Sequence, residues 1–140
     1  MNQLEKLVNP KGGLTEYPAK GTSAMKIERL KTNHLQNPLG YQLRGAAVSW
    51  VVTESTGERP AWARLEVAAA EDFADLIYDS GQSDQLDPRG CALPIELAPR
   101  TRYHWRVTVC ADDGDCASAT AWFETGKMDE PYQGQWIAAP

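Results

Sequence analysis

The sequence has little of several features that mark particular classes of protein. Its 140 residues include only three cysteines and two histidines, and 19 acidic residues outnumber 14 basic ones. The net charge of −5 and the lack of basic runs argue against nucleic acid, which binds basic surfaces. No stretch approaches the roughly 18–20 consecutive apolar residues of a membrane span. We therefore expect neither a nucleic acid nor a membrane as partner.

The three cysteines lack the C-x-x-C spacing of zinc and redox sites. The segment Met1–Ala24 has no apolar core of an export signal. These features favour a cytoplasmic location, where cysteines stay reduced. Cys110 and Cys116 flank the expected hairpin loop Asp112–Gly114, so they would face each other across two strands. A cross-strand disulfide is thus the alternative, but the expected location favours three free thiols.

Signatures of catalysis and of cofactor binding are missing as well. The glycines form neither a phosphate-binding loop nor a dinucleotide fingerprint, and no serine lies in a nucleophile elbow. Only His34 and His104 could serve as bases, and we expect His104 on the outer surface of a strand. Two acidic clusters are expected in solvated loops: Asp112, Asp113 and Asp115 at a hairpin tip, and Glu71, Asp72 and Asp75 in a turn. We expect no catalytic residue, cofactor or metal.

The length fits one domain with its own core. Residues 1–24 contain prolines and glycines without apolar periodicity, which predicts a flexible N-terminal tail. Residues 25–127 are the expected domain. Residues 128–140 are the expected linker into a following domain.

Short apolar runs divided by turn signals predict seven strands in this domain. They are Lys26–Lys31, Ala46–Thr53, Ala61–Ala69, Leu76–Ser80, Ala92–Leu97, Arg102–Ala111 and Ala117–Thr125. Seven strands in about 100 residues are typical of an all-β, antiparallel immunoglobulin-like sandwich. Apolar spacing in Ala68–Ile77 predicts a short helical turn. Asn37–Gly40 and Thr56–Pro60 are expected turns or loops.

Alternating apolar and polar residues indicate which side of each strand faces the core. The expected core residues are Val48, Trp50, Val52, Leu65, Val67, Tyr103, Trp105, Val107, Val109 and Phe123. The same alternation places Trp62 and Trp122 on the outside. Exposed tryptophans either dock another domain or stack on sugar rings. We favour docking, with glycan contact as the alternative.

The segment Leu97–Val107 carries the most specific local pattern. Tyr103 begins an expected strand, and Leu97 and Pro99 precede it. This pattern predicts a tyrosine corner, in which the inward tyrosine returns its hydroxyl to upstream backbone. The motif is structural, and we expect no catalytic role for it.

Together these pieces resemble a known family. Leu97-x-Pro99-x-Thr101-x-Tyr103 with Trp105–Val107, Ser49–Trp50 and Phe123–Gly126 resembles a fibronectin type III domain. More narrowly, Lys26–Asn33, Asn37–Gly40, Tyr78–Gly81 and Trp122–Gly126 are similar to the N-terminal domain of bacterial α-L-rhamnosidases of glycoside hydrolase family 78. Trp136–Ile137 with Pro140 resembles the entry into that family's next β-domain.

The resemblance implies a fibronectin type III-like accessory domain within a larger enzyme. Such enzymes remove terminal α-L-rhamnose with inversion, and their catalytic acids lie in a helical barrel C-terminal to this region. No residue of this chain inherits a catalytic role. The implied role is structural, bracing or orienting neighbouring domains of the same polypeptide. A carbohydrate-binding module is one alternative, and a free-standing domain that pairs through an exposed strand edge is another.

Overall fold

The computed structural model describes residues 24–131 and 134. All of the expected tail except Ala24 lies outside the described residues, as does most of the expected linker 128–140. No helix in the described part of the chain is long and apolar enough to cross a membrane.

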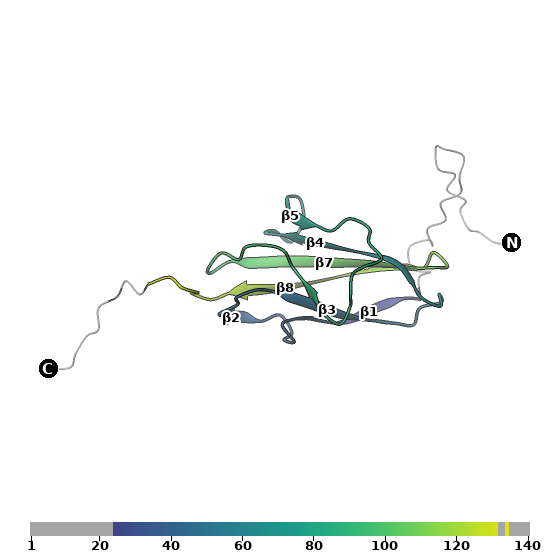
Figure 1. Cartoon of the computed structure of the whole chain (residues 1–140), viewed down its shortest axis with the longest axis horizontal. Helices are drawn as coiled ribbons and strands as arrows, with labels where there is room; N and C mark the ends of the chain where they lie inside the picture. Colours follow the sequence, from purple (N-terminus) through teal and green to yellow (C-terminus); the bar gives the residue numbers. More distant parts are fainter. Residues whose placement is uncertain (1–23, 132–133, 135–140) are drawn as a thin grey trace.

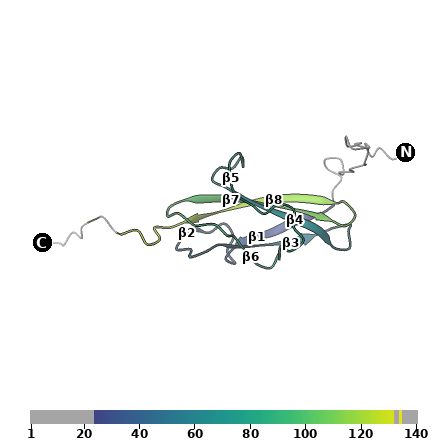
Figure 2. The ribbon, with the colours of Figure 1, turned by 45° about the horizontal axis from the view of Figure 1, so that its top comes forward.

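Two β-sheets pack face to face, as Figures 1 and 2 show from two directions. The smaller sheet has the order β1-β3-β6, and the larger has the order β2-β8-β7-β4-β5. The strands are β1 (Lys26–Thr32), β2 (Leu39–Tyr41), β3 (Ala47–Thr53), β4 (Pro60–Ala68), β5 (Leu76–Asp79), β6 (Cys91–Ala92), β7 (Arg102–Ala111) and β8 (Cys116–Thr125). The predicted all-β sandwich is confirmed.

The described residues form eight strands, one more than predicted. The additional strand, β2, lies where the sequence predicts a turn at Asn37–Gly40, and it pairs with β8 in parallel. Both Asn37 and Gly40 have positive φ angles, of 42° and 76°, which explains the turn-like composition. All three residues of β2 are exposed, so the strand shows no alternation of buried and exposed residues. Its pairing with β8 defines it.

Two other local predictions need correction. The expected strand Ala92–Leu97 is reduced to the two-residue β6. The helical turn predicted within Ala68–Ile77 is wrong. The Phe73 N–H donates to Ala70 C=O at 3.2 Å and closes a single turn, and the φ angle of Phe73 is 54°, which is not helical. The apolar spacing was misleading: Phe73 is buried, whereas Ala69 and Ile77 are exposed.

The core lies between the sheets and follows the predicted alternation. Trp105, Phe123, Leu65, Val67, Val107 and Val48 are fully buried, and Trp50, Tyr103 and Val109 are nearly so. Val52 is only partly buried and packs at the margin. The inward faces predicted for β3, β4, β7 and β8 are therefore confirmed. Two large indoles, Trp50 from one sheet and Trp105 from the other, belong to the same buried cluster.

The loop before β7 is held by the tyrosine that follows it. Ala98 N–H donates a hydrogen bond of 2.8 Å to the Tyr103 hydroxyl. The Tyr103 ring stacks on Phe123 with ring centroids 5.2 Å apart. Thr125 Oγ1 accepts a hydrogen bond from Thr101 N–H at 2.9 Å and donates one to Ala98 C=O at 2.6 Å. The loop is thus fastened to both β7 and β8. Leu97 and Pro99 in this loop are half-buried.

Replacing Tyr103 with phenylalanine should lower the free energy of unfolding by about 1–3 kcal/mol, because the Ala98 amide loses its acceptor. Tyr41→Phe is the matched control, since Tyr41 is exposed on β2 and should lose nothing. Urea unfolding followed by tryptophan fluorescence measures both variants. Equal midpoints for Tyr103→Phe and the unmodified chain would contradict the structural role of the hydroxyl.

Candidate functional site

The outward face of the five-stranded sheet carries several charged side chains from neighbouring strands. Its centre is an ion-paired network across neighbouring strands. Arg106 Nε and Nη2 donate to the two carboxylate oxygens of Glu66 at 2.9 and 2.8 Å. Arg64 donates to both carboxylate oxygens of Asp79 at 2.8 and 2.5 Å. Glu66 is buried although it lies on this face, so its carboxylate is enclosed by its partners.

This network shifts the pKa values of Asp79, Arg64 and Arg106. The hydrogen bonds from Arg64 are the main cause that lowers the pKa of Asp79 to about 2. The hydrogen bond to Glu66 raises the pKa of Arg106 above its ordinary value. Both arginines are therefore paired cations rather than an open site for an anion. Sequence reasoning missed this network, although aligning the two long strands places Glu66 opposite Arg106.

A shallow hollow of about 480 Å³ lies at one end of the face. It is lined by Asn37, Glu71, Phe73, Arg102, His104, Thr120, Ala121 and Trp122. The guanidinium carbon of Arg102 lies 4.0 Å from the centroid of the Trp122 ring, and that of Arg106 lies 4.5 Å from the Phe73 ring. One face of each aromatic ring is therefore covered by a cation from β7. His104 faces the hollow, so the expected outward orientation is confirmed.

The two tryptophans predicted to face outward lie at opposite ends of this face. Trp62 pairs with Cys110, whereas Trp122 pairs with His104, six residues away along β7. Six residues of extended strand span roughly 20 Å. Both indoles are half-buried. They therefore do not form one platform for a single sugar ring.

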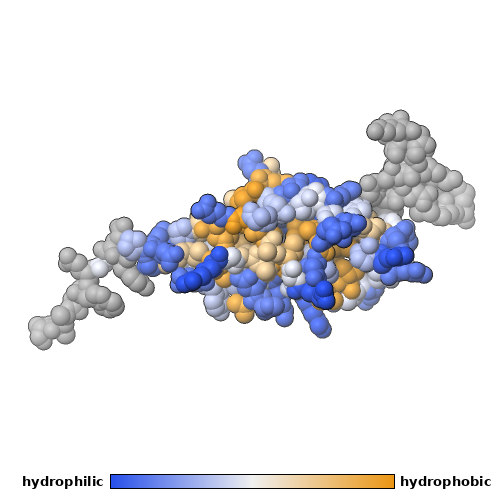
Figure 3. All heavy atoms as spheres, in the orientation of Figure 1, coloured by the Kyte–Doolittle hydropathy of each residue, from blue (hydrophilic) through white to orange (hydrophobic). Residues whose placement is uncertain are grey.

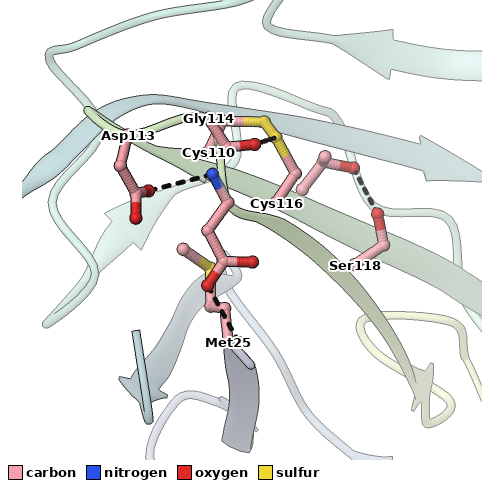
Figure 4. Close-up of a disulfide and its surroundings, with 8 residues drawn as sticks. Met25, Cys110, Asp113, Gly114, Cys116 and Ser118 are labelled. Atoms are coloured by element: carbon pink, nitrogen blue, oxygen red, sulfur yellow. Dashed lines mark hydrogen bonds between the residues drawn. A yellow bond between two sulfur atoms is a disulfide. The ribbon is translucent and has the colours of Figure 1, made fainter. Parts of the chain in front are cut away.

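The other end of the face is closed by a disulfide between Cys110 and Cys116, shown in Figure 4. The prediction of three free thiols is wrong. The hairpin register places the two cysteines directly opposite each other, with Cα atoms 4.1 Å apart, and this proximity outweighs the argument from location. Cys91 is the one free cysteine among the described residues, and burial raises the pKa of its thiol.

The acidic cluster beside the disulfide has a structural role. Asp115 is buried, contrary to the prediction of a solvated loop. Its carboxylate accepts hydrogen bonds from Met25 N–H at 3.1 Å and from Thr56 Oγ1 at 3.3 Å. Asp113 also bonds Thr56 Oγ1 and accepts from Asp115 N–H at 3.0 Å. These carboxylates fasten the start of β1 to the hairpin (Figure 4) and also fasten the loop after β3 to it.

The second acidic cluster, Glu71, Asp72 and Asp75, is exposed on the turn between β4 and β5. It follows Ala68, whereas the hairpin cluster lies beyond Pro60 at the other end of β4. These ends are roughly 25 Å apart, well beyond the roughly 6.5–9.5 Å that separates the two carboxyl groups of an inverting glycosidase. Residues 24–131 contain no group of three or more His, Cys, Asp or Glu placed to hold a metal ion.

The Arg64–Asp79 pair should make stability depend on acid pH. The folded pKa of Asp79, about 2, is below its ordinary value of 3.8. Its contribution is therefore fully present above about pH 4 and is lost as the pH falls toward 2. Unfolding by urea at pH 5, 4, 3 and 2 should show a steeper loss in the unmodified chain than in Asp79→Asn. The same slope in both would contradict this role.

The disulfide should be visible by thiol counting. Under denaturing, non-reducing conditions we expect one reactive thiol, Cys91, and three after reduction. Replacing Cys110 and Cys116 together with serine should lower the free energy of unfolding by about 2 kcal/mol, because a short loop is no longer closed in the unfolded chain. Cys91→Ser is the control, because it removes a cysteine sulfur that is not part of the disulfide. Three reactive thiols before reduction would refute the bridge.

Known proteins share this fold and part of this sequence. An α-L-rhamnosidase from Streptomyces avermitilis is 34% identical over 128 residues, which cover 84% of this chain and 12% of the relative. The solved structure of an α-L-rhamnosidase from that organism, complexed with L-rhamnose, matches with a TM-score of 0.69 and 31% identity over 84% of this chain and 12% of that one.

The structure of an α-L-rhamnosidase from Dictyoglumus thermophilum matches this chain with a TM-score of 0.63 and 22% identity. The match covers 74% of this chain and 13% of that one, and it shows that the two share a fold. The chain thus spans about an eighth of these relatives. Residues 27–129 match the family model of the Rha78A-like N-terminal immunoglobulin domain. The resemblance found in the sequence is confirmed, and the chain belongs to the Rha78A-like N-terminal immunoglobulin domain family.

Proposed function

We propose that this chain is a non-catalytic accessory domain of a multidomain α-L-rhamnosidase, where it braces or orients neighbouring domains of the same polypeptide. One observation carries the proposal: 84% of the chain matches only 12% of the S. avermitilis α-L-rhamnosidase. Under this proposal the parent enzyme hydrolyses terminal α-L-rhamnose with inversion, using residues outside this chain. Residues 25–127 form the domain, and 128–140 lead into the next one.

The state of the carboxylates supports a non-catalytic role. An acid or base must reach the substrate, but Glu66 is buried against Arg106 and Asp115 is buried against Met25 and Thr56. Asp79 is held by Arg64. These groups stabilise the sandwich, and stabilisation is what an accessory domain requires.

The purified chain should not hydrolyse p-nitrophenyl α-L-rhamnopyranoside above the rate in buffer, because the proposal places the catalytic acids elsewhere. Release of nitrophenol, followed by absorbance, measures this, with an active α-L-rhamnosidase as positive control. Hydrolysis by this chain that disappears on replacing one of its own carboxylates, such as Glu71→Gln, would overturn the proposal.

Carbohydrate binding is the second candidate, and the hollow beside Trp122 is the observation in its favour. The Arg102 guanidinium over the indole weighs against it, because stacking on that ring face requires the cation to move. A saturable change in tryptophan fluorescence with L-rhamnose, abolished by Trp122→Ala but not by Trp62→Ala, would favour binding over bracing. We propose instead that Trp62 and Trp122 contact neighbouring domains, at opposite ends of the face.

The compartment of the protein stays a prediction. The sequence favours the cytoplasm, but the Cys110–Cys116 disulfide counts against a reducing compartment. The third alternative, a free-standing domain that pairs through a strand edge, requires self-association or capture of a partner strand.

A further inference from the structure

We propose that the C-terminal end of the sandwich, formed by β2 and the exit turn Lys127–Glu130, is the surface on which the next domain of the same polypeptide docks. This inference rests on the proposed function, since it requires a domain to follow. It adds the location of the contact and the residues that form it. Throughout, this surface is called the exit surface.

The chain leaves β8 along a path that backbone contacts fix. Gly126 N–H donates to Tyr41 C=O at 2.9 Å, and Gly126 C=O accepts from Arg100 N–H at 2.8 Å. A Cβ atom at residue 126 would lie 2.4 Å from the carbonyl oxygen of Gly40. Only glycine therefore allows the exit strand to cross β2 this closely. The crossing links β2, the loop before β7 and the end of β8.

Side chains extend this attachment beyond the last strand. Arg100 forms an ion pair with Glu130 at 3.2 Å. The Gln42 amide donates to Asp129 at 3.3 Å, and Glu130 N–H closes a turn on Lys127 C=O at 3.2 Å. The chain thus stays attached to the sandwich as far as Glu130. A domain that follows therefore starts from this fixed point, and this end of the sandwich is the surface nearest to it.

Two large apolar side chains are exposed beside the fixed exit. Leu39 is 56% exposed and Tyr41 is 51% exposed, the two largest values among the exposed large apolar side chains of the described residues. Figure 1 shows β2 at the end of the sandwich where the yellow exit segment leaves. An exposed apolar edge strand invites unwanted pairing unless something covers it. A tethered domain covers it at high effective concentration, so even a modest contact area suffices.

The opposite edge of the same sheet offers a matched comparison. Leu76 and Ile77 on β5 are also exposed apolar residues, and Figure 3 shows hydrophobic surface over the region of β5. The contacts that fix the exit turn are made by Gly126, Arg100 and Gln42, and none of these residues belongs to β5. Exposure alone therefore does not select the exit surface. The fixed path of the chain does.

Hydrogen exchange in the full-length polypeptide and in the 140-residue chain tests the proposal. Amides in 39–42 and 126–130 should exchange at least tenfold more slowly in the full-length protein, while those in 76–79 stay unchanged. Equal exchange of the amides in 39–42 and 126–130 in both proteins would overturn the exit surface. A gene that encodes no further domain would overturn both this inference and the proposed function.

Variants separate docking from folding. In the full-length protein, the double variant Leu39→Ser with Tyr41→Ser should abolish the slow exchange and speed tryptic cleavage after Lys127 about tenfold. The control Ile77→Ser should change neither. In the 140-residue chain the double variant should keep its melting temperature, because both side chains are already exposed.

Two further results would separate the exit surface from a dimer contact and from the proposed function. If the 140-residue chain dimerises in light scattering and the double variant is monomeric, a second copy is the occupant and the proposal is wrong. Rhamnoside hydrolysis by the 140-residue chain would overturn the non-catalytic part of the proposed function, but it would not remove the following domain, so the exit surface would stand. Failure of the exit surface alone would leave the accessory role intact.

Discussion

The position of β7 between β4 and β8 is the constraint on which the rest of the structure depends. Its register places Trp105 between Val67 and Ala121, and it places Arg106 between Glu66 and Thr120. Because side chains alternate along a strand, a slip of one residue would turn the buried indole toward solvent and the guanidinium into the core. One pairing thus determines the apolar interior, the ion-paired exterior and the alignment of Cys110 with Cys116.

The outward face produced by this register is occupied by its own contacts. Arg106 pairs with Glu66, and Arg102 lies over Trp122. At the hairpin end, the disulfide and buried Asp115 close the sandwich. The end with β2 differs, because Leu39 remains open beside the exit of the chain. Such a division suits the proposed accessory role, in which the domain contributes stability and orientation.

The sequence predicts the parts of this structure that depend on local alternation, and it fails where distant pairing decides. β7 shows a clean period of two, so its buried face around Trp105 follows from the sequence. β2 shows no alternation of buried and exposed residues, so only its pairing with β8 identifies it as a strand. Phe73 suggested a helix through its spacing to Ile77, yet only Phe73 is buried. Similarly, the half-buried state of Trp122 depends on Arg102, a neighbour that only the register reveals.

Under the proposed function, this immunoglobulin-like sandwich is one non-catalytic part of a larger rhamnosidase. Sequencing the source DNA beyond the codon for Pro140 is the first test of this proposal. We expect an open reading frame that continues for several hundred codons, into β-domains and then the alternating helices of a catalytic barrel. A stop codon directly after Pro140 would contradict it and would make the chain a free-standing interaction domain.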